Sequence, residues 1–521
     1  MKKERAFRLN HAVFWPVVII MAVILAISFI NQEWFSTIIT NALNAEVINF
    51  KWMVGPVVLF LFITMLVLLI HPVGKIKIGG NDAKAKFSNF SYWGLCICST
   101  IAIGIVFWGV AQPLTYFMEP WPGWGLEAGS PEAAVKAIAQ TNLEWSWGQY
   151  TLYGIFAITM AVAIYNHNQP ERTSSFLYML RGKPANNVIN IVVDILCLFG
   201  IVAGVTCSLG TGTMQMSAGI HSILGVDITK MLWLLVELIV VAGFLLMSVG
   251  GIAKGIRIVT DQNLRLYYIV MALMVVIGPT LYIFDMYFES HGYMFNNMIQ
   301  DITYTGGING DDSPIFWMIW LYVSAVAFAP IIGLFIAKIS YGRTIKEMVV
   351  GNLIMPALVN SAWFVIFGAT AINWQTTGEF DIWGRMEEMG MEAAMFEFFE
   401  HLPFGKVFSV VFWIVILLSF VTLASSATTS AALTSMIPTR EIGEDEEPPM
   451  WIKVIWALIM AVSAYVFISF AGIDGAKSMA LIGGMPSMVL VAIAGICVWI
   501  MMMKSGKKEG NLNDLGNKKQ A

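Results

Sequence analysis

Charged residues are scarce in this chain of 521 residues. Only 12% are Asp, Glu, Lys or Arg, about half of the roughly 25% that is usual in soluble domains. Binding to nucleic acid rests on a surplus of positive charge, and the net charge here is -4. The composition, with 58% hydrophobic residues, excludes a water-soluble enzyme, a nucleic-acid binder and a disordered scaffold. It predicts an all-α polytopic membrane protein.

The chain also lacks the motifs of an enzyme, of a metal site and of a channel. Its five cysteines lie in apolar stretches and form no CxxC pair, so they predict neither a metal site nor a disulfide framework. The sequence has no P-loop, and inside its apolar stretches it has neither HExxH nor paired aspartates, which an intramembrane enzyme would need. A channel would show a filter-like repeat or a ring of charges, and the sequence has neither. We therefore expect no enzyme, no cofactor and no bound metal.

Long apolar runs fill most of the sequence. A membrane-crossing helix needs about 20 mostly apolar residues. About twelve stretches meet this requirement, at 12–31, 50–71, 90–117, 146–165, 187–217, 228–249, 263–287, 314–337, 349–373, 405–436, 451–471 and 476–503. No segment between them is long enough for a soluble domain, and 386–400 is typical of a short amphipathic helix outside the membrane.

Lysine and arginine gather in alternate loops. One set of loops carries Lys75, Arg172, Lys254 and Lys338, whereas the intervening loops, such as 118–145, are acidic. Because short cytoplasmic loops carry an excess of Lys and Arg, the pattern predicts a multi-pass protein of the cell membrane with both termini in the cytoplasm.

Two of the predicted spans contain small or helix-breaking residues at membrane depth. The third span holds Gly104, Gly109 and Pro113, and the eighth runs from Ser324 to Pro330 through small residues. Broken helices at corresponding positions of two halves point to a transporter site, and these two spans lie five apart, as an inverted five-plus-five repeat requires. The alternative is that small residues only let the helices pack closely.

Several motifs along the chain resemble the betaine/choline/carnitine transporter family. The third span reads FWG-x-x-Gln-Pro at Phe107–Pro113, where the family has FWG-x-x-Glu-Pro. The segment FIAKISYGRT at 335–344 is similar to the most recognisable family signature. Further likeness is found in Phe87-Ser88, GVTCSLG at 204–210, Lys254-Gly255-Ile256, Glu446–Pro449 and Gly483–Pro486.

The resemblance implies a leucine-transporter-like core with alternating access around a midplane site, two extra N-terminal helices and a homotrimer. The expected organisation is a tail and two extra helices in 1–86, a first inverted repeat with spans three to seven in 87–287, an external helix and the second repeat in 288–503, and a cytoplasmic tail in 504–521.

One departure from the family concerns the coupling cation. Sodium-coupled members have a Thr-Ser pair in the tenth span, and this chain has Thr422 and Leu423. Loss of the second hydroxyl removes an oxygen ligand from a hard cation. Arg257 stands where sodium-coupled members have an uncharged residue, as in the sodium-independent carnitine/γ-butyrobetaine exchanger of the family. Arg257 and Thr422 are therefore the predicted cation-site substitute, and the alternative for Arg257 is a cytoplasmic residue at the start of a helix.

A second departure concerns the substrate site. Family members that bind trimethylammonium groups have a Trp-Trp pair and a further aromatic in the eighth span, and this chain has Ser324, Ala325 and Phe328. In the fourth span Trp147 is kept while two other aromatics are lost. The resemblance implies Trp317 in an outer vestibule and the following substrate-binding residues: Trp108, Gln112, Trp147, Trp320, Ser324, Ala325 and Phe328.

The sequence thus predicts a secondary transporter of a small zwitterionic or quaternary-amine solute. Its expected partners are this solute and the lipid bilayer, and no nucleic acid. Sodium-independent exchange is the favoured mechanism, and a sodium-coupled symporter of a betaine-like or amino-acid-like solute is the alternative. The lost aromatics leave two options for the solute: a cage rebuilt in a shifted register by Trp147, Trp320, Tyr322 and Phe328, or an altered head group. The intramembrane Glu237 is either a proton site or an interface residue.

Overall fold

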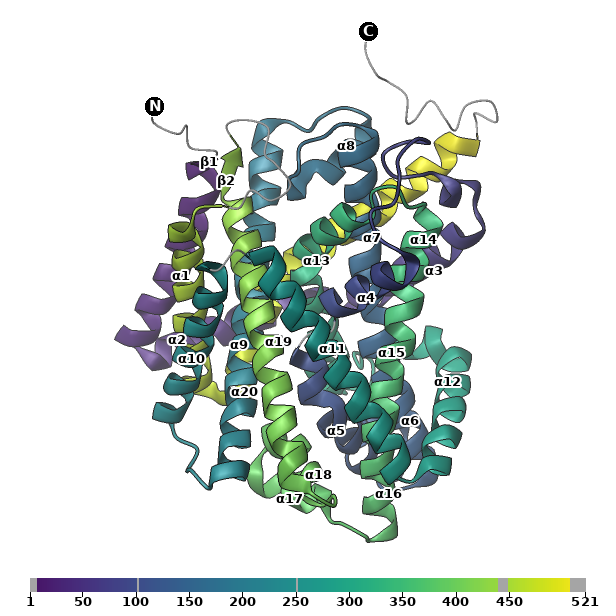
Figure 1. Cartoon of the computed structure of the whole chain (residues 1–521), viewed down its shortest axis with the longest axis vertical. Helices are drawn as coiled ribbons and strands as arrows, with labels where there is room; N and C mark the ends of the chain where they lie inside the picture. Colours follow the sequence, from purple (N-terminus) through teal and green to yellow (C-terminus); the bar gives the residue numbers. More distant parts are fainter. Residues whose placement is uncertain (1–6, 101–102, 250–251, 439–447, 507–521) are drawn as a thin grey trace.

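The computed structural model describes residues 7–100, 103–249, 252–438 and 448–506, which form a bundle of helices and one two-stranded sheet (Figure 1). The described chain begins and ends at the same end of the bundle (Figure 1). Apart from the short sheet all of its regular elements are helical, so the prediction of an all-α polytopic membrane protein is confirmed.

The first half of the described chain contains β1 and the helices up to α11. Their bounds are β1 Phe7–Leu9, α1 His11–Ile30, α2 Gln32–Leu43, η1 Asn44–Ile48, α3 Asn49–Ile70, η2 Pro72–Lys75, α4 Asn89–Thr100, α5 Ile103–Met118, η3 Pro122–Trp124, α6 Pro131–Asn142, η4 Leu143–Gly148, α7 Gln149–Ala161, η5 Val162–Asn166, η6 Thr173–Leu177, α8 Tyr178–Arg181, α9 Asn187–Leu224, α10 Lys230–Val249 and α11 Ile252–Ile277.

The second half contains the remaining helices and β2. Their bounds are α12 Thr280–Thr303, η7 Ile315–Ile319, α13 Trp320–Ile339, α14 Ile345–Val349, η8 Val350–Ile354, α15 Met355–Phe364, η9 Val365–Ala369, α16 Thr370–Thr377, α17 Ile382–Met389, η10 Met391–Ala393, α18 Ala394–Glu400, α19 Gly405–Thr434, β2 Met436–Pro438 and α20 Met450–Gly506. The strands β1 and β2 pair antiparallel and join the start of the chain to the end of α19.

Each predicted span overlaps a helix, but the helices do not all qualify as crossings. Within the described residues, eight helices are long and apolar enough to cross a membrane, or nine if the bent pair α11–α12 is one span. The helix α20 contains the last two predicted spans, and its backbone leaves helical geometry at Ala471 and Gly472. The number of twelve crossings therefore stays a prediction.

Three helix boundaries differ from those predicted. A continuous buried helix begins at Pro131 and runs through α6, η4 and α7 to Asn166, whereas the predicted span began at 146. Ser130 caps this helix and Pro131 suits its first turn. The location of 131–145 outside the membrane stays a prediction. The predicted span 263–287 bends by 111° between α11 and α12, because Pro279 offers no backbone N–H. The expected helix 386–400 is divided at Gly390, whose φ is 92°.

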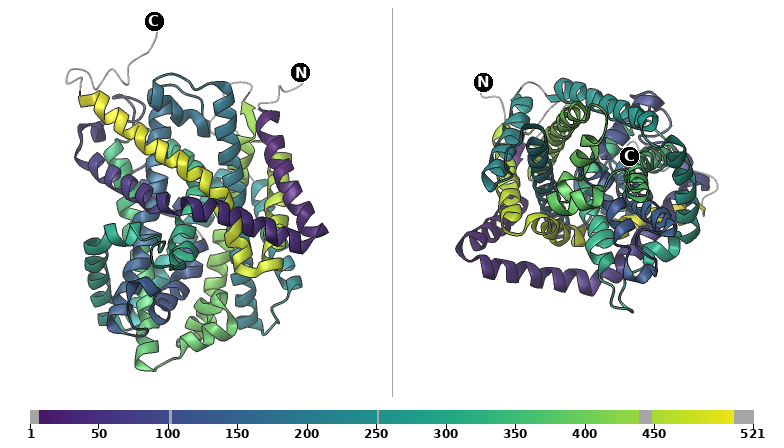
Figure 2. Two further views of the ribbon diagram at one scale, coloured as in Figure 1. Left: turned by 180° about the vertical axis from the view of Figure 1, so that it is seen from behind. Right: turned by 90° about the horizontal axis from the view of Figure 1, so that it is seen from below.

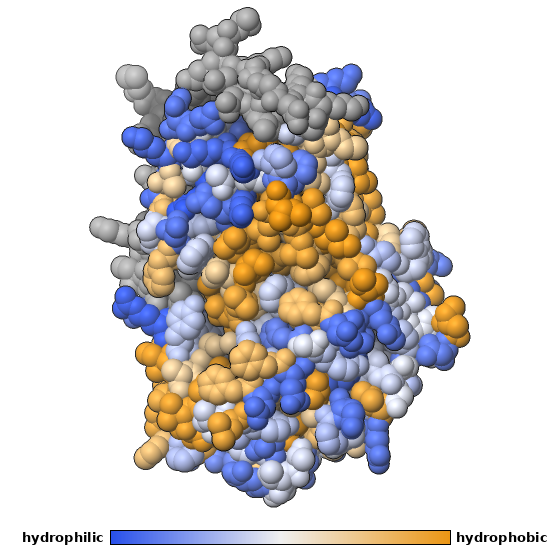
Figure 3. Space-filling view, turned by 90° about the vertical axis from the view of Figure 1, so that its right-hand side faces the viewer, coloured by the Kyte–Doolittle hydropathy of each residue, from blue (hydrophilic) through white to orange (hydrophobic). Residues whose placement is uncertain are grey.

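Packing of the long helices creates the centre of the molecule. The helix α13 lies against α7 and α20, and α9 lies against α19 and α20. On the back face α3 crosses the later part of α20 (Figure 2). The side of the molecule in Figure 3 carries an apolar patch across its middle with hydrophilic residues towards its top, which is the distribution expected of a bundle surrounded by lipid.

Candidate functional site

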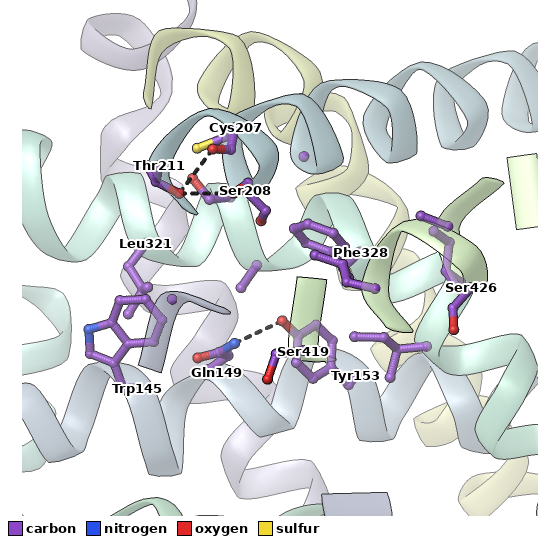
Figure 4. Close-up of a pocket in the computed structure, with 18 of the residues that line it drawn as sticks. Trp145, Gln149, Tyr153, Cys207, Ser208, Thr211, Leu321, Phe328, Ser419 and Ser426 are labelled. Atoms are coloured by element: carbon purple, nitrogen blue, oxygen red, sulfur yellow. Dashed lines mark hydrogen bonds between the residues drawn. The ribbon is translucent and has the colours of Figure 1, made fainter. Parts of the chain in front are cut away.

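A cavity of about 160 Å³ lies among α5, α7, α9, α11, α13 and α19 (Figure 4). No Asp, Glu, Lys or Arg is found among the described residues that line it. The lining residues are Gly104, Trp108, Trp145, Gln149, Tyr153, Gly204, Cys207, Ser208, Thr211, Asn263, Tyr267, Trp320, Leu321, Ser324, Ala325, Phe328, Ile331, Ile332, Ser419, Thr422, Leu423, Ser426 and Ala427.

Aromatic rings dominate the cavity wall. Six of the lining residues are aromatic, namely Trp108, Trp145, Tyr153, Tyr267, Trp320 and Phe328. Along α13 the lining extends from Trp320 to Ile332, which is about 18 Å of helix. A Cβ atom at Gly204 would lie 3.0 Å from the ring of Phe328, so glycine is what allows α9 to approach this ring. Aromatic faces of this kind attract cations.

Polar groups of the cavity wall are only partly satisfied. The Gln149 side chain donates to the Tyr153 hydroxyl at 2.8 Å, as Figure 4 shows, and the Asn263 amide donates to Ser419 Oγ at 2.8 Å. The oxygens of both amides, together with Ser324 Oγ, have no hydrogen-bond partner within the described chain. Buried polar atoms are seldom left without a partner, so these three atoms are available to a polar solute.

The structure brings six of the predicted site residues together. Trp108, Trp320, Ser324, Ala325, Phe328 and Thr422 all line the cavity. The Thr422 hydroxyl donates to the Leu418 carbonyl at 2.8 Å. Beside it, the apolar Leu423 also faces the cavity.

Three other predicted residues do not line the cavity. The ring of Trp147 packs against Phe62 and Phe295, with centroid distances of 6.5 and 5.0 Å, on the side of α3 and α12. Gln112 and Trp317 lie behind the cavity wall, and Tyr322 of the shifted-register alternative donates to the Leu143 carbonyl at 3.2 Å. Instead of Trp147, the cavity receives Trp145 from the π-helical turn η4.

Gln112 belongs to a buried network around Glu144. The Glu144 carboxylate accepts hydrogen bonds from Gln112 at 2.5 Å, from Gln140 at 2.8 Å and from the Tyr116 hydroxyl at 3.0 Å. The indole N–H of Trp145 donates to the Gln112 Oε1 atom at 2.6 Å. The network therefore fixes the orientation of a ring that lines the cavity. Glu144 is not among the site residues predicted from the sequence, although an acid inside a buried helix is itself a signal.

A column of aromatic rings leads away from the cavity at Trp320. Edge-to-face contacts at 5.5, 5.5 and 5.2 Å connect Trp320 to Trp108, Trp108 to Trp317 and Trp317 to Tyr116. Tyr116 then contacts Trp121, 5.5 Å away, in the loop after α5. The predicted vestibule residue Trp317 is thus the middle of a continuous path from a loop to the cavity.

Two predicted ionisable residues need separate mention. Arg257 lies on α11, and its side chain is outside the described residues, so its role as a cation substitute stays a prediction. Glu237 is buried on α10 away from the cavity lining, and neither of its carboxylate oxygens has a hydrogen-bond partner in the described part of the chain.

A cavity with room for a small solute, lined by residues of long apolar helices, is typical of a membrane transporter. The comparisons agree with this class. Residues 12–507 match the BCCT family, described as betaine/carnitine/choline family transporter, and the chain belongs to that family. It is a transporter of the cell membrane and not an enzyme.

The chain is similar to several bacterial transporters along most of its length. It is 27% identical over 485 residues to the glycine betaine transporter OpuD of Bacillus subtilis, covering 92% of each chain. It is 29% identical over 421 residues to glycine betaine transporter 1 of Vibrio parahaemolyticus, covering 80% of this chain and 78% of the relative. The ectoine/hydroxyectoine transporter of Virgibacillus pantothenticus is 26% identical over 501 residues, with 96% and 98% covered.

Proposed function

We propose that the protein carries a small zwitterion with a quaternary or delocalised ammonium group across the cell membrane by alternating access. The observation that carries this proposal is the cavity lining, which is aromatic and contains no charged side chain among the described residues. A net-neutral solute leaves no uncompensated charge in such a site, whereas a simple cation or anion would. The names of the relatives, which transport glycine betaine or ectoine, support the same class.

The rings and the polar atoms suggest how the zwitterion is held. Trp145 from η4, Tyr153 from α7 and Phe328 from α13 offer aromatic faces to the ammonium group, in a register different from that of the family pattern. Ser324 and Ala325 replace large rings and leave room for a bulkier head group. The unpartnered Ser324 hydroxyl supplies a hydrogen bond for such a group or for the carboxylate.

We further propose that transport is sodium-independent exchange. Leu423 stands at the cavity where a second hydroxyl would bind sodium, and Arg257 is the proposed replacement charge. The alternative is sodium symport, which is favoured by the run of hydroxyls that α19 presents to the cavity, from Ser419 through Thr422 to Ser426. A homotrimer with cytoplasmic termini completes the proposal.

Uptake of radiolabelled glycine betaine and ectoine into proteoliposomes tests the proposal. Competition by carnitine, γ-butyrobetaine, choline and neutral amino acids gives the specificity, with sodium either present or replaced by N-methylglucamine. We expect zwitterions with a quaternary or delocalised ammonium to compete best, and uptake to be stimulated by unlabelled solute inside. Uptake that requires sodium would support the symporter, and competition only by non-ammonium solutes would contradict the proposed substrate class.

A further inference from the structure

One buried lysine lies among the tryptophans at the end of the cavity. Lys477 is on α20, a few residues after the break at Ala471 and Gly472, and it is only 9% exposed. Its Nζ atom lies 4.5 Å from the ring centroid of Trp320, 4.7 Å from that of Trp317 and 4.8 Å from that of Trp108. We call these three residues the tryptophan cage.

The cage is the main partner of this ammonium group. Among the described residues no carboxylate lies within ion-pair distance of Lys477, and its hydrogen bond to the Phe316 carbonyl is long at 3.5 Å. Asp474, one turn earlier, and Glu144 act on it electrostatically from further away. A buried ammonium without a paired acid needs other stabilisation, and desolvated tryptophan faces provide it.

The cage and the cavity share two rings. Trp108 and Trp320 line the cavity, whereas Lys477 and Trp317 do not. Both shared rings lie at the end of the cavity where α13 begins, next to the aromatic column that leads to the loop after α5. The ammonium group of Lys477 therefore lies against two of the rings that a solute in the cavity could contact.

We propose that Lys477 is a tethered ammonium group that fills the tryptophan cage and keeps the cationic head of a solute out of it. A solute in the cavity then turns its carboxylate, not its ammonium, towards this end, and simple cations are disfavoured relative to zwitterions. This last step rests on the proposed function, because it concerns the solutes that the cavity accepts. Occupancy of the cage by Lys477 does not depend on it.

Binding of tetramethylammonium to the purified protein in detergent tests the occupancy without any transport substrate. In Lys477→Ala the emptied cage should bind tetramethylammonium at least tenfold more tightly than the unsubstituted protein does, as measured by quenching of tryptophan fluorescence and by calorimetry. Lys477→Arg keeps a cation in place and should behave like the unsubstituted protein. Lys406→Ala, which removes an exposed lysine at the start of α19, is the matched control.

The gain in Lys477→Ala should disappear when Trp317→Leu is added. Equal affinity in the unsubstituted protein and in Lys477→Ala, with both eluting as one symmetrical peak, would overturn the proposal. A second measurement covers the case in which Lys477→Ala does not fold. Reductive methylation of Lys477, followed by mass spectrometry, should increase severalfold in Trp317→Leu but not in Trp147→Leu, and no increase would equally overturn the proposal.

The selectivity step is tested separately in proteoliposomes with Lys477→Met, which is uncharged but close in volume. The ratio of the choline to the glycine betaine inhibition constant should fall at least tenfold in this variant. If this ratio is unchanged while Lys477→Ala binds tetramethylammonium more tightly, Lys477 occupies the cage but does not determine which solutes the cavity accepts. If the unsubstituted protein takes up no ammonium solute, and none competes for uptake, the proposed function is rejected. The tetramethylammonium binding measured in detergent would still be valid.

Discussion

Two buried lysines near the two ends of the aromatic column, Lys136 by Trp124 and Lys477 by Trp320, are stabilised in different ways. Lys136 on α6 forms an ion pair with Asp301 of α12 at 2.6 Å and also lies 5.0 Å from the ring centroid of Trp124. Lys477 has three tryptophan faces and, in the described chain, no ion pair. The first arrangement fixes one charge to one partner, whereas the second leaves the ammonium group bound to surfaces that any cation can use.

This difference indicates that Lys136 stabilises the packing of the helices, whereas Lys477 belongs to the binding region. Replacing one member of a buried ion pair leaves an unpaired charge, so Lys136 and Asp301 hold α6 to α12. Replacing Lys477 leaves only uncharged rings.

The largest expected effect comes from removing one member of the ion pair. Lys136→Met should lower stability by about 3–5 kcal/mol, because Asp301 stays buried without its partner. The measurement is the fraction of monodisperse protein after heating in detergent. The double variant Lys136→Met/Asp301→Asn should recover most of the loss, and Lys477→Met should lose much less. Equal losses in the two lysine variants would break the comparison.

Glu144→Gln should have the next largest effect. The carboxylate accepts from Gln112, Gln140 and Tyr116, and an amide places a donor against one of them. A buried donor that loses its acceptor costs about 1–3 kcal/mol. The same heating assay measures the loss, and Glu132→Gln on the exposed first turn of α6 is the control. A variant as stable as the unsubstituted protein would show that the network does not hold Trp145.

Trp145→Ala should weaken solute binding more than Trp147→Ala does. Trp145 lines the cavity, and Trp147 faces Phe62 and Phe295. A desolvated cation–π contact of about 2 kcal/mol corresponds to roughly 30-fold in affinity. Equilibrium binding of glycine betaine to the two purified variants measures the difference. A larger loss of affinity in Trp147→Ala would contradict this prediction and would favour the cage expected from the family pattern.

The smallest effect should come from a charge outside the spans. Burial alone would raise the pKa of Asp311, but hydrogen bonds from Ser313, Tyr304 and the Gly123 backbone lower it below its ordinary value of 3.8. Its contribution to stability is therefore complete above that ordinary pKa and is lost as the pH falls through the lower folded pKa. Asp311→Asn should cost about 1 kcal/mol at pH 7 and flatten the acid limb of a pH–stability profile. An identical profile would show that the loop is held by other contacts.

Much of the fold could be predicted because hydropathy reports directly on burial in lipid. The first span was predicted at 12–31 and α1 is His11–Ile30. The helix from Pro131 was missed because its residues, including Lys136 and Asn142, are too polar for an apolar run, and neighbouring helices bury them instead. The bend at Gly278–Pro279 was missed because the apolar run continues through it.

The site was predictable where a straight helix preserves the spacing of its residues. Trp320, Ser324 and Phe328 are four residues apart on α13 and share its cavity face. In contrast, the π-helical turn η4 changes which residues face inward, so Trp145 could not be distinguished from Trp147 by pattern alone. Lys477 comes from α20, far away in the sequence, and only the packed structure places it against Trp108.

The pairing of β1 with β2 also bears on how the protein is made. Met436 follows Leu9 by roughly 430 residues, and a ribosome adds about 5–20 residues per second. The first strand therefore waits about 20 to 85 s for its partner, while nearly all the helices are being inserted. A bulky fusion at the N-terminus would have to remain clear of β1 throughout that interval, so a purification tag is better placed after Gly506.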